Sequence, residues 1–106
     1  MQLINEFIFK DNETAENFIN EINRILKNKN YITYGDICHI LFEDDIEYNH
    51  YDIYKKHGWT LLPVLYVEEV KHFDDIQYLV KLPEVKLIDN FIKELELKGE
   101  LKWKMK

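Results

Sequence analysis

Residues 53–63 read IYKKHGWTLLP. A helical pattern ends at His57, and an apolar run closed by Pro63 follows. Gly58 is one of only three glycines in the chain, and it stands directly before Trp59, one of two tryptophans. We expect Gly58 to take the left-handed position that ends many helices. We expect Trp59 to pack in the core where this helix passes into a sheet.

The segments before this junction predict a strand and three helices. Residues 1–10 are rich in β-branched and aromatic side chains, which predicts a strand with Phe7 and Phe9 on one face. Apolar residues at spacings of three and four predict a helix over about 12–27, capped by Asp11 or Asn12.

The second and third helices follow a brief extended piece at Tyr31–Thr33. Thr33 and Asp36 have the spacing of a capping box, so the second helix should begin at Tyr34. The third is expected over about Glu47–His57.

The segments after the junction predict a hairpin, a helix and a strand. Residues 61–82 alternate with period two around an acidic turn at Asp74–Asp75, which is typical of a β-hairpin. Apolar spacing from Val85 to Leu95 predicts a fourth helix that Gly99 closes. The last residues alternate again and predict a terminal strand that could pair with residues 3–9.

Length and composition favour a single globular domain over residues 1–106. The chain carries a net charge of −6, which disfavours tight non-specific binding to nucleic acid. A single cysteine, Cys38, excludes an internal disulfide and favours a reducing compartment. The N-terminus lacks the pattern of a signal peptide, and no run approaches the roughly 20 apolar residues that span a bilayer. We therefore expect a cytoplasmic protein without a membrane partner.

The element order predicts an α+β fold with a winged helix-turn-helix-like core, three helices plus a β-hairpin, extended by a C-terminal helix and terminal strands. Residues 15–83 resemble a group of small phage and prophage proteins with the motifs V-T-V-A-D-L-Y, K-Y-G-W-T-D-L and L-L-D-L-P. The matching stretches here are Ile32–Cys38, Lys56–Leu62 and Leu79–Pro83. This resemblance implies a phage or mobile-element origin and a winged-helix-like fold. The turn at Asp74–Gln77 lacks the basic residues that a DNA-binding wing would place against phosphate.

No catalytic, cofactor or metal site is expected. Cys38 and the four histidines lack the spacing of metal ligands, and Cys38 is better explained as a small core residue. Cys38 and His39 are adjacent in a helix and would point apart, so they form no catalytic dyad. No glycine-rich phosphate loop is present. We therefore expect a protein that is not an enzyme.

An acidic, tyrosine-rich stretch is the candidate surface for a protein partner. Its residues are Glu43, Asp44, Asp45, Glu47, Tyr48, Tyr51 and Asp52. The alternative is a winged-helix transcriptional regulator that reads DNA as a dimer with its third helix, through Asn49, Lys55 and Lys56. Residues 31–58 contain six acids and two lysines, so DNA is the less favoured partner.

We therefore expect a small non-enzymatic accessory protein of a phage or mobile element that binds another protein. An inhibitor of a host defence nuclease, of the anti-CRISPR type, fits this size, charge and origin. A component of virion assembly is a weaker alternative. The identity of the partner and the oligomeric state, including a homodimer, stay open, as does whether the hairpin is a wing or a dimer edge.

Overall fold

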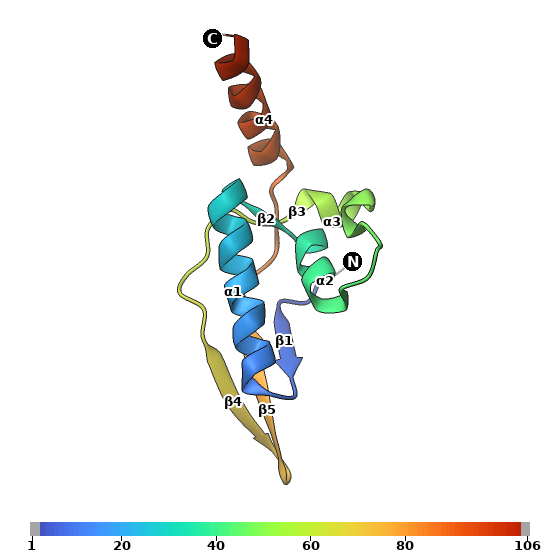
Figure 1. Cartoon of the computed structure of the whole chain (residues 1–106), viewed down its shortest axis with the longest axis vertical. Helices are drawn as coiled ribbons and strands as arrows, with labels where there is room; N and C mark the ends of the chain where they lie inside the picture. Colours follow the sequence, from blue (N-terminus) through green and yellow to red (C-terminus); the bar gives the residue numbers. More distant parts are fainter. Residues whose placement is uncertain (1–2, 105–106) are drawn as a thin grey trace.

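The structure, a computed structural model, describes residues 3–104 of the chain and the side chains of residues 3–97. Within these residues the chain forms four α-helices, one 3-10 helix and two three-stranded sheets, which confirms the predicted α+β class. Figure 1 shows α1 along the body of the molecule, a hairpin extending beyond one end and α4 beyond the other. The elements in order are β1 (Glu6–Phe9), α1 (Asn12–Lys29), β2 (Ile32–Thr33), α2 (Tyr34–Phe42), η1 (Tyr48–His50), α3 (Asp52–Lys56), β3 (His57–Trp59), β4 (Val67–His72), β5 (Asp75–Lys81), β6 (Lys86–Leu87) and α4 (Asp89–Lys104).

The first strand and helix form where the sequence predicts them. The rings of Phe7 and Phe9 lie 5.2 and 5.0 Å from the ring of Phe18 on α1, so both face the same side of β1. The side chain of Asp11 caps α1 by accepting a hydrogen bond from the backbone N–H of Thr14 at 2.7 Å. These contacts join the start of the chain to the buried stripe of α1.

The larger sheet has the strand order β1-β5-β4, and both pairings are antiparallel. Its register places Val80 between Phe7 on one side and Val67 on the other. The predicted hairpin is therefore confirmed, with its turn at Phe73–Asp74, one residue earlier than expected. Phe7 and Val80 lie on the face that packs toward α1, and both side chains are buried.

The smaller sheet has the order β2-β3-β6 and joins three short segments that lie far apart in the sequence. Ile32 lies opposite Trp59, and Gly58 lies opposite both Thr33 and Lys86. Trp59 is 3% exposed, and its indole Nε1–H donates a hydrogen bond to the carbonyl oxygen of Pro83 at 2.8 Å. The predicted core position of Trp59 is confirmed.

The structure corrects the expected conformation of Gly58. It is not a left-handed residue at the end of a helix, because it lies inside β3 and no glycine with a positive φ occurs among the described residues. A glycine is needed because β2 passes very close. A Cβ at Gly58 would collide with the carbonyl oxygen of Ile32 and would lie 2.8 Å from the Cα of Thr33.

The third helix is much shorter than predicted. The segment Glu47–His57 contains the 3-10 turn η1 and the five-residue helix α3, separated by Tyr51. Neither Glu47 nor Tyr51 caps the following turn with its side chain. The aromatic, Asn and His residues of this stretch are weak helix formers, and His57 pairs with β6 instead of continuing the helix.

The C-terminal predictions are corrected as well. Val85 precedes the helix, and β6 takes the next two residues, so α4 begins at Asp89. Gly99 lies within α4 and does not close it, and residues 101–104 are helical, so the predicted terminal strand is wrong for them. Residues 105–106 lie outside the described residues. The Glu, Leu and Lys residues here are good helix formers, and β1 pairs with β5 instead.

A winged-helix arrangement is not confirmed. In the expected core, the strand between the first two helices would pair with the hairpin. Here that strand, β2, pairs with β3, while the β4–β5 hairpin pairs with the N-terminal strand β1. The hairpin therefore projects from a sheet that the N-terminal addition completes (Figure 1).

Candidate functional site

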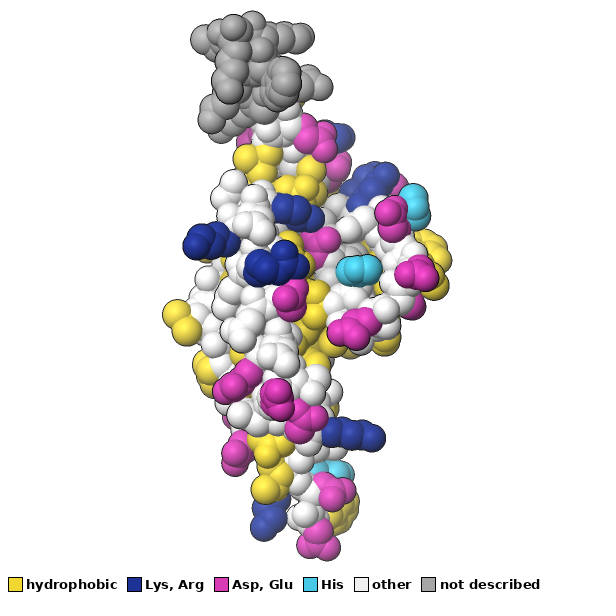
Figure 2. Space-filling view, viewed as in Figure 1, with side chains coloured by type: hydrophobic (Ala, Val, Ile, Leu, Met, Phe, Trp, Pro, Cys, Tyr) yellow, Lys and Arg dark blue, Asp and Glu magenta, His cyan; other side chains and the backbone are white. Residues whose placement is uncertain are grey.

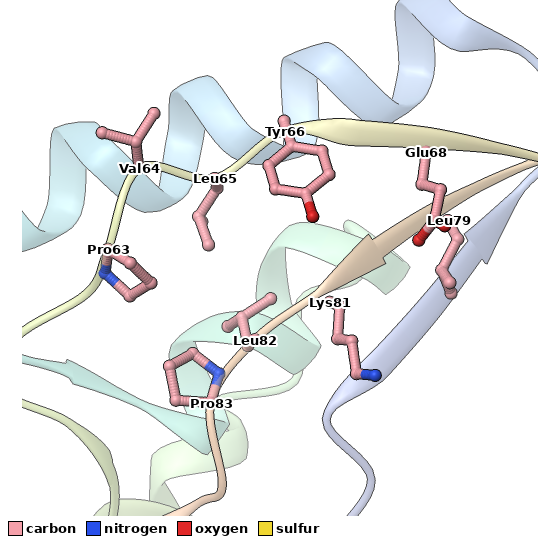
Figure 3. Close-up of a pocket in the computed structure, with 9 residues that line it drawn as sticks. All are labelled: Pro63, Val64, Leu65, Tyr66, Glu68, Leu79, Lys81, Leu82 and Pro83. Carbon is pink, nitrogen blue, oxygen red and sulfur yellow. The ribbon is translucent and has the colours of Figure 1, made fainter.

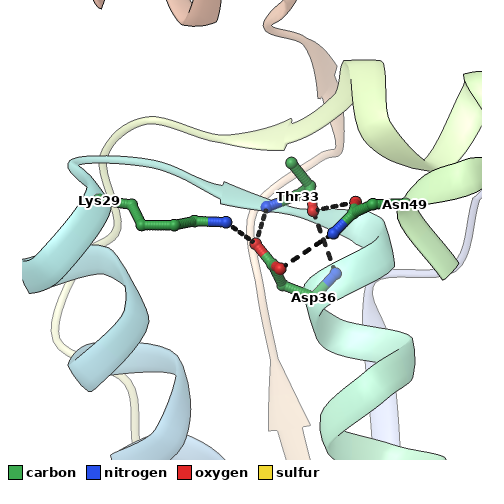
Figure 4. Close-up of polar contacts among 4 residues, drawn as sticks. All are labelled: Lys29, Thr33, Asp36 and Asn49. Carbon is green, nitrogen blue, oxygen red and sulfur yellow. Dashed lines mark hydrogen bonds and ion pairs between the residues drawn. The ribbon is translucent and has the colours of Figure 1, made fainter. Parts of the chain in front are cut away.

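A polar network holds the candidate surface in place (Figure 4). The capping box predicted for α2 is confirmed, because Asp36 N–H donates to Thr33 Oγ1 and Thr33 N–H donates to Asp36 Oδ2, each at 3.1 Å. Asn49 of η1 joins this box, since its Oδ1 accepts from the Thr33 hydroxyl at 2.7 Å and its Nδ2 donates to Asp36 Oδ1 at 3.2 Å. Lys29, at the end of α1, completes the network with an ion pair to Asp36 at 2.7 Å.

Asp36 is the charged centre of this network. Its side chain is only 15% exposed, and burial alone would raise its pKa. The hydrogen bond and charge of Lys29, together with the hydrogen bonds from Thr33, outweigh burial and lower the pKa of Asp36 below its ordinary value. The carboxylate therefore stays ionised and ties α1, α2 and η1 together.

A row of aromatic rings connects this surface to the core. The ring of Trp59 lies 6.5 Å from that of Tyr34, which lies 5.4 Å from that of Tyr54. Tyr51 continues the row at 5.7 Å in an edge-to-face contact, and its side chain is 56% exposed. Burial raises the pKa of Tyr34, which therefore stays neutral. The row gives Tyr51, a predicted partner-binding residue, a rigid support.

The candidate surface is the stretch 42–52, which we name the acidic–aromatic segment. It leaves α2 through Glu43, whose backbone is left-handed (φ 45°) and whose N–H donates to the carbonyl of His39. Two apolar side chains on it are exposed, Phe42 by 61% and Ile46 by 51%. Exposed acids lie beside them: Glu43, Asp45, Glu47 and Asp52. Figure 2 shows acidic side chains spread over this part of the surface, next to hydrophobic ones.

Asp44 and Tyr48 give the segment its internal order. The hydroxyl of Tyr48 donates to Asp44 Oδ2 at 2.8 Å, and the ring of Tyr48 packs 5.9 Å from that of Phe42. The hydrogen bond to the Asp44 carboxylate raises the pKa of Tyr48 to about 12. Asp44 also accepts a hydrogen bond from the N–H of Ile46 at 3.4 Å. These two predicted partner-binding residues are half-buried, and they shape the segment.

The residues of the DNA-reading alternative are already engaged within the chain. Lys55 and Lys56 form ion pairs with Asp52 at 3.3 and 3.0 Å. The Asn49 amide is held by Thr33 and Asp36, as described above.

Two features of the surface escaped sequence reasoning. Phe42 and Ile46 flank the acids in the run FEDDIEY, and this mixture of apolar and acidic residues was the available signal. The second feature is a shallow hollow of about 340 Å³ between the loop before β4 and the end of β5 (Figure 3). Buried Leu65 and Leu82 point toward each other in it, and exposed Val64 lies at its rim.

Among the described residues, no group of His, Cys, Asp and Glu side chains is arranged to hold a metal ion. Cys38 is buried, and burial raises the pKa of its thiol, so little thiolate forms at neutral pH. In the same part of the chain, no helix combines the length and apolar character needed to cross a membrane.

Comparison of the chain with protein-family models, with curated proteins and with solved structures gave no match.

Proposed function

We propose that this protein binds a basic surface of a protein partner through the acidic–aromatic segment. The observation that carries the proposal is the placement of exposed Phe42, Ile46 and Tyr51 among exposed carboxylates. Aromatic and apolar anchors supply much of the affinity at protein interfaces, and complementary charge steers association and selects the partner.

The charges of the segment support a basic partner. Among the described residues, Glu43 and Asp45 take part in no ion pair, and Glu47 pairs only with His50, which is itself exposed. Their charge is therefore available to a basic partner. The segment is anchored by the Asp36 network and the aromatic row, which lowers the entropy cost of binding.

We propose that binding through this segment inhibits the partner. An acidic segment that covers a basic nucleic-acid channel would block a host defence nuclease, as an anti-CRISPR protein of a phage or mobile element would. The resemblance of residues 15–83 to small phage proteins supports inhibition, as does the net charge of −6. We also propose that the core is winged-helix-like. The order of α1, β2, α2 and α3 along the chain supports this proposal.

The alternative, a regulator that reads DNA, has less support. Base contacts need free side-chain amides and cations. Asn49 donates and accepts within the Asp36 network, and Asp52 forms ion pairs with both Lys55 and Lys56. A DNA complex would have to break these contacts or draw on other residues.

The experiment is a capture of partners from host-cell lysate with tagged protein, with and without nuclease. Three proteins are compared: the wild type, the surface variant Glu43→Gln/Asp45→Asn/Glu47→Gln and a control variant with the same change in charge, Glu16→Gln/Glu84→Gln/Glu94→Gln. All six positions are exposed. We expect a protein that the wild type and the control variant retain after nuclease treatment and that the surface variant loses.

Two results would contradict the proposal. Capture that disappears with nuclease would favour the DNA-binding alternative. Equal capture by the surface and control variants would show that the acidic–aromatic segment is not the contact.

A further inference from the structure

The β4 strand is an open edge of the larger sheet, because the strand order is β1-β5-β4. Five of its six residues, from Glu68 to His72, are exposed. Figure 1 shows the β4–β5 hairpin extending beyond the end of α1. Such an edge offers unpaired N–H and C=O groups to another strand, and natural proteins commonly guard or cover it.

The register of the hairpin identifies which backbone groups are free. His72 and Asp75 flank the two-residue turn and are paired, so they form the first hydrogen-bonded pair of the hairpin. Such pairs alternate along an antiparallel ladder. Glu68, Val70 and His72 therefore direct their backbone groups toward β5, while those of Glu69 and Lys71 point to the open edge.

Symmetry limits how two copies of β4 could pair. A two-fold axis between antiparallel strands is perpendicular to the sheet and keeps each side chain on its own face. The axis therefore passes between a residue and the same residue of the second copy. The two strands overlap over several residues only when the axis lies at one of the four central residues of β4. These are Glu68, Glu69, Val70 and Lys71.

The charges of the residues at the axis favour one of these four registers over the others. An axis at Glu68 or Glu69 sets two glutamates against each other, and an axis at Lys71 sets two lysines against each other. Like charges directly opposite each other are destabilising. An axis at Val70 instead pairs the two valines, which are 38% exposed in the single chain.

The register centred on Val70 also matches every neighbouring position. Glu69 lies opposite Lys71 of the second copy, and Lys71 opposite its Glu69, so two ion pairs form on one face. Glu68 lies opposite His72 on the other face. Among the described residues, neither Glu69 nor Lys71 has an ion-pair partner within its own chain. The outward backbone groups of Glu69 and Lys71 are the ones that this register joins.

We propose that two copies of this chain associate through β4 in the antiparallel register centred on Val70, which merges two three-stranded sheets into one of six strands. The sequence of this edge, VEEVKH, is complementary to itself only in that register. This proposal does not depend on the function of the acidic–aromatic segment, which lies on other elements of the fold.

Two charge variants test the proposal by sedimentation velocity, with a protomer mass of 13.0 kDa. The wild type should show a concentration-dependent mass up to twice that value. Glu69→Lys alone and Lys71→Glu alone each set like charges opposite each other twice, so each should raise the dissociation constant by about tenfold or more. An equimolar mixture of the two variants should associate again, because each like-charged strand then meets the opposite charge.

The mixture distinguishes loss of pairing from loss of folding, since a misfolded variant would not be rescued. A wild type that stays monomeric at about millimolar concentration, where even weak complexes form, would overturn the proposal. So would a dimer that ignores both substitutions, or a mixture that stays monomeric.

Cross-linking tests the register itself. Val70→Cys should form a disulfide-linked dimer under oxidising conditions, because directly opposite Cβ atoms lie about 5 Å apart. Glu68→Cys is the matched control, since the two cysteines would lie about 14 Å apart, four residues along the strands at roughly 3.4 Å per residue. Cross-linking of the control but not of Val70→Cys would contradict the register.

Discussion

At the residue scale, Gly58 is a position where no side chain fits. Its place is set by the close passage of β2, where the backbone of Ile32 and Thr33 leaves no room for a Cβ. Pairing on both sides, with β2 and β6, prevents the backbone from moving away.

Gly58→Ala should therefore destabilise the protein by about 3 kcal/mol, as overpacking of a closed site does. Chemical denaturation measures the free energy of unfolding. Thr60→Ala at a neighbouring exposed position is the control, with an expected change within about 0.5 kcal/mol. Equal stability of the two variants would show that β2 and β3 are not packed as described.

Trp59 is the large side chain that this close packing encloses. Trp59→Ala should cost about 3–5 kcal/mol, because it empties an aromatic site in the core. Trp59→Phe should cost less, since it keeps most of the packing and loses the hydrogen bond to Pro83. Thermal unfolding followed by circular dichroism ranks the three proteins. A melting temperature for Trp59→Ala equal to that of the wild type would refute the core position.

Tyr48 gives a titration test of the acidic–aromatic segment. Its hydrogen bond to Asp44 raises the pKa of the phenol to about 12 from 10.0, and Asp44→Asn should bring it back toward the ordinary value. Because the folded-state pKa is raised, this contact stabilises the fold below pH 10 and is lost as the pH rises through about 12. Ring-carbon NMR, assigned with Tyr48→Phe, measures the shift. An unchanged pKa in Asp44→Asn would show that the hydrogen bond is absent.

At the element scale, the Asp36 network joins the end of α1, the start of α2 and η1. Since the pKa of Asp36 is lowered in the folded state, its stabilisation is full above the ordinary value of 3.8 and is lost as the pH falls through the lower folded value.

Asp36→Asn should therefore cost about 1–3 kcal/mol near neutral pH, because it leaves buried donors with a poorer acceptor. The difference in the free energy of unfolding between this variant and the wild type, its disadvantage, should shrink in acid below pH 3.8. Urea denaturation across pH measures both effects. A disadvantage that stays constant from neutral pH into this acid range would contradict the role of the ionised carboxylate.

The same scale shows which elements could be predicted from sequence. The capping box at Thr33 and the long apolar stripe of α1 are local signals, and both elements formed. The prediction of a long third helix was wrong, because this stretch lacks a side-chain cap and continues into β3. Gly58 resembled a helix terminator, but the contact that requires it comes from β2, which sequence spacing does not reveal.

At the scale of the whole molecule, the sequence predicted the β4–β5 hairpin but not the pairings between strands that are far apart in the chain. β3 and β6 have three and two residues, too few to carry a period, and they meet only after the chain has folded. The pairing of β1 with β5 joins Glu6 with Lys81, 75 positions later in the chain, and no local pattern selects it over pairing with the C-terminal residues. The candidate acids were found from sequence because a charge run is visible locally. Exposure of Phe42 and Ile46 beside them required the fold.

The most direct test of the proposed function is the affinity of the captured partner, once purified, for three forms of this chain at low and physiological salt. We expect the surface variant Glu43→Gln/Asp45→Asn/Glu47→Gln to bind at least about tenfold more weakly than the wild type at low salt, with a smaller difference at physiological salt where charges are screened. The control variant Glu16→Gln/Glu84→Gln/Glu94→Gln should bind like the wild type. Affinities of all three forms within about twofold of one another would contradict binding through the acidic–aromatic segment.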